Sequence, residues 1–190
     1  MFKLAVASIA IITLFHEGTG GGALAGFLHP LLGLDHLLAM VAVGLLSAQM
    51  GGRAIWTVPA AFVSVMILGG ILGLNGVPLP WVEYGIAGSV LILGVALAAK
   101  QSLPEVIAMV FVGLFALFHG HAHGTELPTY SDTILYVVSY VIGFVVATVG
   151  LHVIGALLGT MAVRSSRGDM LLRVAGVVMA IIGVNMIIGV

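Results

Sequence analysis

Three histidines alternate with small residues in the stretch FHGHAHGTELP (118–128). His119 and His123 are four residues apart, so a helix would place them one above the other, where two imidazoles can bind a divalent cation together. His121 would point elsewhere if the helix continued, whereas unwinding at the two glycines would let all three imidazoles converge. Glu126 could supply an oxygen ligand or orient an imidazole. The stretch predicts a metal site, and a solvated histidine-rich loop that binds nothing specific is the alternative.

A second group of ionisable side chains lies within an apolar stretch, HPLLGLDHLLAM (29–40). Ionisable residues at membrane depth cost about 2.5–3.5 kcal/mol each on insertion scales, so their presence needs a reason. Asp35 and His36 are expected near the midplane, where they would bind a cation or relay protons; a buried pair that satisfies itself is the alternative. His29 shares a face with His36 at about 10 Å in a regular helix, which suits successive ligand positions better than one shared ion.

Pro30 bears on where this helix begins. A proline is favourable as the first residue of a helix, which would leave His29 just before it. A broken entry at His29-Pro30, with Gly33 following, would also free backbone carbonyls to line a polar cavity. The pattern therefore predicts an irregular entry to this span.

Two further histidines lie outside the two motifs. His16, next to Glu17, is a candidate outer contributor to metal collection. His152 is expected toward the cytoplasmic half of a later span, where an exit ligand and a hydrogen bond to a neighbouring helix are equally good explanations. Neither residue is assigned to the metal site from the sequence.

Composition places these motifs in a membrane protein. The chain has 190 residues, of which 61% are hydrophobic and 7% charged, whereas soluble chains are typically about 25% charged. The apolar runs are long and continuous, which favours transmembrane helices over the short alternating segments of a β-barrel. Because there is no cysteine, any metal site must use imidazole, carboxylate, backbone or water. No basic cluster indicates nucleic acid, and no nucleotide-binding motif indicates an ATPase.

The predicted fold is all-α: a polytopic transmembrane helix bundle of six spans in a single domain covering 24–190. Each span is near or above the roughly 20 residues that cross the hydrocarbon, and the long fifth span must tilt, protrude or break at a glycine. The expected spans are 24–48, 54–74, 82–100, 104–123, 133–162 and 170–190. The preceding segment, 1–23, is a signal-like apolar run followed by an extracytoplasmic lead-in. Since no small-x-small site directly precedes His16, a cleaved signal peptide and a retained short helix both stay open.

The cations predict the orientation of the bundle in a bacterial inner membrane. With six spans, every lysine and arginine falls on one side, which the positive-inside rule assigns to the cytoplasm. These residues are Lys3, Arg53, Lys100, Arg164, Arg167 and Arg173. The histidine-rich turn and the C-terminus are then extracytoplasmic.

The two motifs together resemble signature segments of the HupE/UreJ family of nickel and cobalt membrane permeases. The similarity rests on HPLLGLDHLLAMVAVGLL (29–46) and FHGHAHGTELP (118–128), in this order and separation, within a likeness that covers the chain from His16 onward. The resemblance implies a polytopic protein, encoded beside nickel-enzyme systems such as hydrogenase and urease, that moves Ni²⁺ or a similar ion into the cytoplasm. It also implies a metal pathway formed by His29, Asp35 and His36 on one helix and by His119, His123 and Glu126 on another.

The predicted function is transport of a divalent transition-metal cation into the cytoplasm, with Ni²⁺ first and Co²⁺ or Zn²⁺ as alternatives. Imidazoles with one carboxylate bind such ions well and Mg²⁺ poorly. The metal is cargo, no permanent cofactor is expected, and the other partners are the lipid bilayer and, in a homo-oligomer, further copies of the chain. The metal ligands expected along the route, from the outside inward, are His121, Glu126, His29, His119, His123, Asp35 and His36.

Two other classes of function fit parts of the pattern. An intramembrane zinc hydrolase is one, because an HxxxH pair with an Asp and a His from another helix can hold Zn²⁺ and an activated water. It predicts a tightly held ion and a lipid-sized cavity. A metal sensor or storage protein is the other, and it predicts binding without net flux, whereas a transporter predicts exchangeable metal and ligands in series.

Overall fold

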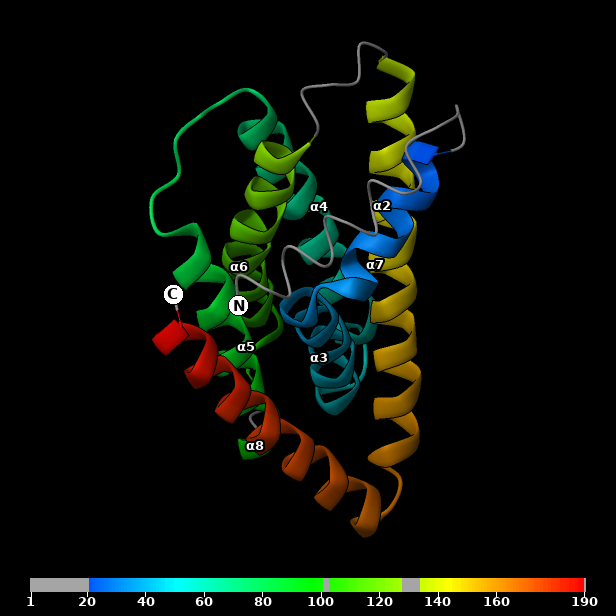
Figure 1. Ribbon diagram of the computed structural model, residues 1–190. Coiled ribbons are helices and arrows are strands. Elements are labelled where there is room, and N and C mark those ends of the chain that lie inside the picture. The colour runs from blue at the N-terminus through cyan, green and yellow to red at the C-terminus, as the bar shows by residue number, and fades with distance from the viewer. Residues whose placement is uncertain (1–20, 101–102, 128–133, 190) are drawn as a thin grey trace.

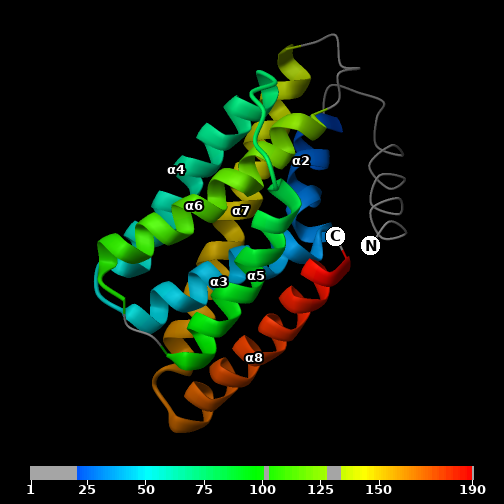
Figure 2. The same cartoon turned by 90° about the vertical axis from the view of Figure 1, so that its left-hand side faces the viewer.

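The computed structural model describes residues 21–100, 103–127 and 134–189, and within these ranges every regular element is an α-helix (Figures 1 and 2). The helices are α2 (Gly21–Leu32), α3 (Leu34–Met50), α4 (Ala54–Leu74), α5 (Val82–Ala99), α6 (Glu105–Glu126), α7 (Ile134–Ala162) and α8 (Ser166–Gly189). The prediction of an all-helical bundle is confirmed. The signal-like segment, His16 and Glu17 lie outside the described residues.

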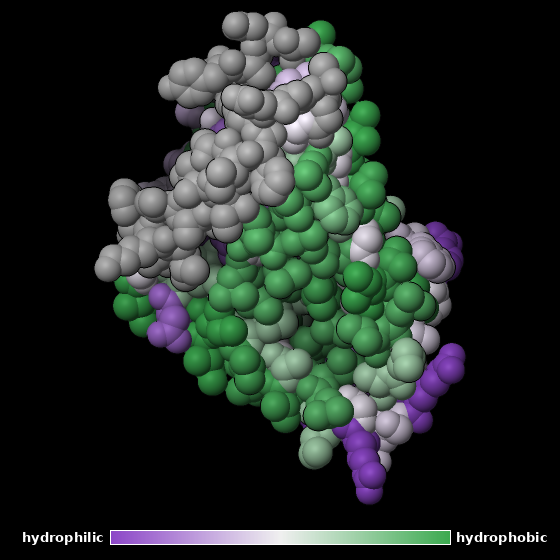
Figure 3. Space-filling model, turned by 45° about the vertical axis from the view of Figure 1, so that its right-hand side comes forward, coloured by the Kyte–Doolittle hydropathy of each residue, from purple (hydrophilic) through white to green (hydrophobic). Residues whose placement is uncertain are grey.

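The lengths and surfaces of these helices are those of an integral membrane protein. Five helices, α4 to α8, are long and apolar enough to cross a membrane, and the bent pair α2–α3 passes the same test together, which makes up to six spans in the described part of the chain. Large apolar side chains such as Ile142, Leu157 and Val178 are half exposed or more. Figure 3 shows a broad hydrophobic face with most of the visible hydrophilic residues at its margins. This surface suits hydrocarbon rather than water.

The first predicted span, 24–48, is broken. The chain turns by 79° between α2 and α3, and Gly33 is the single residue between them. Pro30 lies inside α2 and does not begin a helix, so that prediction is wrong. The carbonyl of His29 is not freed either, because it accepts a hydrogen bond from the Gly33 N–H at 3.2 Å. The irregular entry therefore exists, but it lies three residues later than expected.

α7 is the long fifth span, and it is continuous from Ile134 to Ala162 (Figure 1). No break occurs at Gly143, Gly150 or Gly155, and two of these glycines serve close packing instead. Gly143 lies against the backbone of Ala23 in α2, and Gly155 lies against the backbone of α3. One straight helix therefore supports both halves of the bent span and holds them at their angle.

Every described lysine and arginine gathers at one end of the bundle, here named the basic end. Its members are Arg53, Lys100, Arg164, Arg167 and Arg173. Lys100 forms an ion pair with Asp169 at 2.8 Å, and the Arg173 Nε–H donates to the Ala98 carbonyl at 3.1 Å, which ties α5 to α8. Residues Leu74, Val82 and Glu126 mark the opposite end.

Glycines bring α4 and α6 into backbone contact. A Cβ atom on Gly120 or Gly124 would meet the backbone of Met66 or Gly70 in α4, and one on Gly69 would meet the backbone of α6. Small residues with this spacing let membrane helices approach closely. The unwinding considered for the histidine motif does not occur, since α6 runs unbroken to Glu126.

Candidate metal site

Four imidazoles from three helices converge inside the bundle. The ring centroid of His123 lies 4.6 Å from that of His29 and 4.3 Å from that of His36, and the His36 ring lies 4.6 Å from that of His119. His119 is fully buried, and His36 and His123 are nearly so. We name these four residues the histidine cluster. Both predicted motifs thus contribute imidazoles to the same buried cluster.

The bend after α2 is what brings the first motif together. His29 comes from α2 and His36 from α3, and their ring centroids are 6.3 Å apart across the 79° turn. A straight helix would have separated them by about 10 Å along its axis. The expected spacing of about 10 Å was based on that straight helix and is wrong, and both rings contact His123.

Asp35 determines which nitrogen of His36 faces the cluster. The Asp35 Oδ1 atom accepts a hydrogen bond from His36 Nδ1 at 2.9 Å and another from the His36 backbone N–H at 2.8 Å. A carboxylate on Nδ1 holds the proton there, so the lone pair of a neutral ring is on Nε2. The Nε2 atom is buried and has no hydrogen-bond partner among the described residues. Asp35 is therefore placed to orient His36.

Ser89 of α5 does the same for His119. Its hydroxyl donates to the Ile86 carbonyl at 2.6 Å, and its oxygen lies 2.9 Å from His119 Nε2. Since the only hydroxyl proton is committed to the carbonyl, the imidazole must donate from Nε2, and the lone pair is then on Nδ1. That Nδ1 atom is buried and unpartnered within the described chain. This role of Ser89 becomes visible only once α5 is seen to pack on α6.

His123 contacts both His29 and His36 and is enclosed by aromatic rings. Neither of its ring nitrogens has a hydrogen-bond partner among the described residues. Phe144 of α7 lies 4.1 Å away by ring centroids and is stacked on Tyr140. A small cavity of about 100 Å³, lined mostly by apolar side chains of α4, α6 and α7, adjoins His123. The space is far below the roughly 300 Å³ at which pockets for organic ligands begin.

Glu126 connects the histidine cluster to the end opposite the basic end. Its Oε2 atom lies 3.8 Å from His29 Nε2, and its side chain is 59% exposed. One ligand atom from each of His29, His123 and Glu126 lies within 4.8 Å of the others, a spacing that one metal ion could bridge after small rotations. The pattern of nitrogen and carboxylate oxygen suits borderline divalent cations.

His121 does not join the cluster. Its side chain is buried, and its Nε2–H donates to the Val77 carbonyl in the loop between α4 and α5 at 2.7 Å. An outer collector would need an exposed imidazole, and the structure does not offer one here. Helical geometry is the reason, because a residue two positions from both His119 and His123 points away from them.

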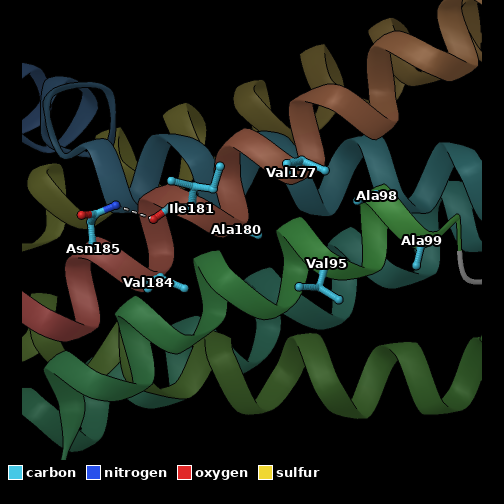
Figure 4. Close-up of a pocket in the computed structure, with 8 residues that line it drawn as sticks. All are labelled: Val95, Ala98, Ala99, Val177, Ala180, Ile181, Val184 and Asn185. Carbon is cyan, nitrogen blue, oxygen red and sulfur yellow. Dashed lines mark hydrogen bonds between the residues drawn. The ribbon is translucent and has the colours of Figure 1, made fainter.

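A separate groove lies between α5 and α8 (Figure 4). It has a volume of about 550 Å³ and is lined by Val95, Ala98, Ala99, Val177, Ala180, Ile181, Val184 and Asn185. The one polar residue among them, Asn185, donates its amide to the Ile181 carbonyl of its own helix. The groove offers no imidazole or carboxylate, so the candidate chemistry belongs to the histidine cluster.

The fold and the site define a class: a polytopic helical membrane protein whose helices bring imidazoles together between them. The comparisons with known proteins narrow that class. The family model described as HupE / UreJ protein matches residues 4–186. Protein HupE from Rhizobium leguminosarum bv. viciae is 45% identical over 188 residues, covering 97% of this chain and 95% of that protein. The chain belongs to the HupE/UreJ family, as its motifs predict, and no solved structure matches it.

Proposed function

We propose that this protein carries a divalent transition-metal cation, Ni²⁺ first and Co²⁺ or Zn²⁺ as alternatives, across the membrane into the cytoplasm. The observation that carries the proposal is the convergence of four imidazoles from α2, α3 and α6 at one buried place. Nitrogen atoms with free lone pairs in a water-poor interior are costly unless they meet a ligand. A bound cation that prefers imidazole ligands would provide the missing partner for these lone pairs.

The order of the side chains supports a route with ligands in series. Glu126 is the exposed entry, His29 follows at 3.8 Å, and His123 lies next to both. Two further steps between ring centroids, 4.3 Å and 4.6 Å, lead on to the remaining members of the cluster, His36 and His119. Neighbouring imidazoles at such distances would let an ion exchange ligands stepwise without full rehydration. Asp35 and Ser89 hold two of the rings in the required tautomers.

The charge distribution gives the orientation that uptake requires. The described cations gather at the basic end, and Glu126 lies at the opposite end. The positive-inside rule assigns the basic end to the cytoplasm of a bacterial inner membrane. The exposed carboxylate would then face outward, where the ion arrives.

Uptake of radioactive nickel into proteoliposomes tests the proposal. The wild-type protein should accumulate Ni²⁺, and His36→Ala and His119→Ala should each reduce the initial rate by about 10- to 100-fold. Asn185→Ala is the matched control, since it removes a polar intramembrane side chain that bonds only within α8 and should leave the rate unchanged. Full uptake in both histidine variants would refute the route. Tight binding by the wild type without flux would instead indicate a sensor or storage protein.

A further inference from the structure

His152 of α7 is a second buried imidazole that the histidine cluster does not use. Its side chain is 2% exposed, and neither ring nitrogen has a hydrogen-bond partner in the part of the chain that the structure describes. The sequence left a bond to a neighbouring helix open as its explanation, and the described residues provide no such bond. A buried imidazole with both nitrogens unpaired is the state expected of a ligand position.

Thr148 adds an oxygen beside it. It lies one helical turn before His152 on the same face of α7, it is fully buried, and its Oγ1 atom is likewise unpartnered among the described residues. Residues four apart on a helix are neighbours. The pair therefore presents a nitrogen and an oxygen to the same interior space.

Phe62 of α4 contacts one imidazole of the histidine cluster and also His152. Its ring centroid lies 5.9 Å from that of His119 and 5.1 Å from that of His152, and the phenyl ring is fully buried. The two imidazole centroids are therefore within about 11 Å of each other, with an apolar ring in contact with both. An ion leaving His119 toward the basic end would meet this ring and then His152.

The backbone around His152 is held firmly. Gly44 of α3 packs against the His152 carbonyl, and Gly155 packs against the backbone of α3. His152 is ten residues, or roughly 15 Å at the usual rise, from the last residue of α7 at the basic end. This depth places it inside the membrane. It is also nearer the basic end than His119, which lies fourteen residues along α6 from Glu105, the partner of Arg53.

We propose that His152 and Thr148 form a second binding station for the transported cation on the basic-end side of Phe62, and that the Phe62 ring separates the two stations. The inference rests on the proposed transport function and assigns residues to the inner half of the transport route. An ion would pass from His119 to His152 when the ring moves aside, and it would leave from there toward the basic end. The cluster determines capture, and the second station determines release.

The test compares two substitutions that remove different properties of the side chain. His152→Leu keeps the packing volume and removes the ligand atom, whereas His152→Cys fills the space poorly but keeps a metal ligand. Ni²⁺ binding to the purified protein, by equilibrium dialysis, and Ni²⁺ uptake into proteoliposomes are measured for each. We expect the affinity of the histidine cluster for Ni²⁺ to stay within about twofold of the wild type in both variants, because neither substitution changes a cluster residue.

Uptake should distinguish the two variants. We expect His152→Leu to lower the rate by at least about tenfold and His152→Cys to retain clearly more, since ligand loss is the defect. Thr148→Val should lower it by a smaller factor. If His152→Leu transports at the wild-type rate, or if it outperforms His152→Cys, the side chain serves packing and the second station is refuted. If the wild type binds Ni²⁺ but moves none, the transport proposal itself fails and the station fails with it.

Discussion

The two faces of α6 carry residues from the same short motif, but one face contributes imidazoles to the cluster and the other packs against α4. One face presents His119 and His123 to the helices of the bent span, where their rings meet other imidazoles. The other presents Gly120 and Gly124 to α4, where the backbones touch. The alternation of histidine with small residues therefore combines two requirements in one segment. The imidazoles need a rigid helix, and the glycines keep that helix against its neighbour.

The glycine face should be the more sensitive to substitution. In Gly120→Leu, the new side chain would begin inside the space of the Met66 backbone, which a membrane helix cannot yield without separating from its neighbour. We expect loss of monodisperse protein in detergent, measured by size-exclusion chromatography. Gly150→Leu is the control, because a Cβ at that position of α7 meets nothing within 4 Å. A well-folded Gly120→Leu variant would contradict the packing described.

The histidine face should be sensitive in function rather than in folding. His123→Gln removes the imidazole that joins His29 to His36 and should lower Ni²⁺ uptake by about 10- to 100-fold while the protein stays folded. The same change in His121→Gln leaves an amide that can still donate to the Val77 carbonyl, so uptake should remain close to the wild-type rate. Rates measured side by side in proteoliposomes decide the comparison. Equal losses in the two variants would mean that the motif acts as a whole and not by face.

A substitution of Asp35 tests whether this carboxylate sets the tautomer of His36. Asp35→Asn keeps the shape of the side chain, but its amide can donate toward His36 Nδ1 and so favours the tautomer with the proton on Nε2. We expect Ni²⁺ affinity to fall by about tenfold, with one fewer nitrogen neighbour in X-ray absorption of the bound ion. Asp169→Asn is the control, since it removes a carboxylate from the Lys100 ion pair at the basic end. Unchanged coordination in Asp35→Asn would exclude tautomer control.

Much of this arrangement follows from local sequence. The spans are predictable because apolar length reports membrane crossing directly, and 54–74 and 133–162 agree with α4 and α7 to within a residue. The pairing of His119 with His123 and the separation of His121 follow from helical geometry alone. The family also follows, because its two motifs are short and specific.

The remaining features depend on tertiary packing, which no local pattern contains. The bend at Gly33 is supported by α7, whose glycines hold α2 and α3 at different angles, and it moves His29 onto His123. A straight-helix estimate therefore placed two histidines at the wrong spacing. Gly120 was considered a point of unwinding because the sequence does not show that α4 lies against it. Ser89 is 30 residues from its partner, His119.

Ser89 therefore tests, with the smallest expected effect, whether a residue of α5 orients His119 on the histidine face of α6. In Ser89→Ala, His119 Nε2 loses its acceptor, so the ring can adopt either tautomer and only part of the population presents Nδ1 to the cluster. That partial loss should lower Ni²⁺ affinity by a few-fold, less than removal of a ligand, because the other three imidazoles remain. Ser64→Ala is the matched control, since the Ser64 hydroxyl donates only to the Ala60 carbonyl of its own helix. Ser89→Thr, which restores a hydroxyl, should recover affinity. If Ser89→Ala binds Ni²⁺ as tightly as the wild type, then contact with the surrounding rings orients His119 and the hydrogen bond does not.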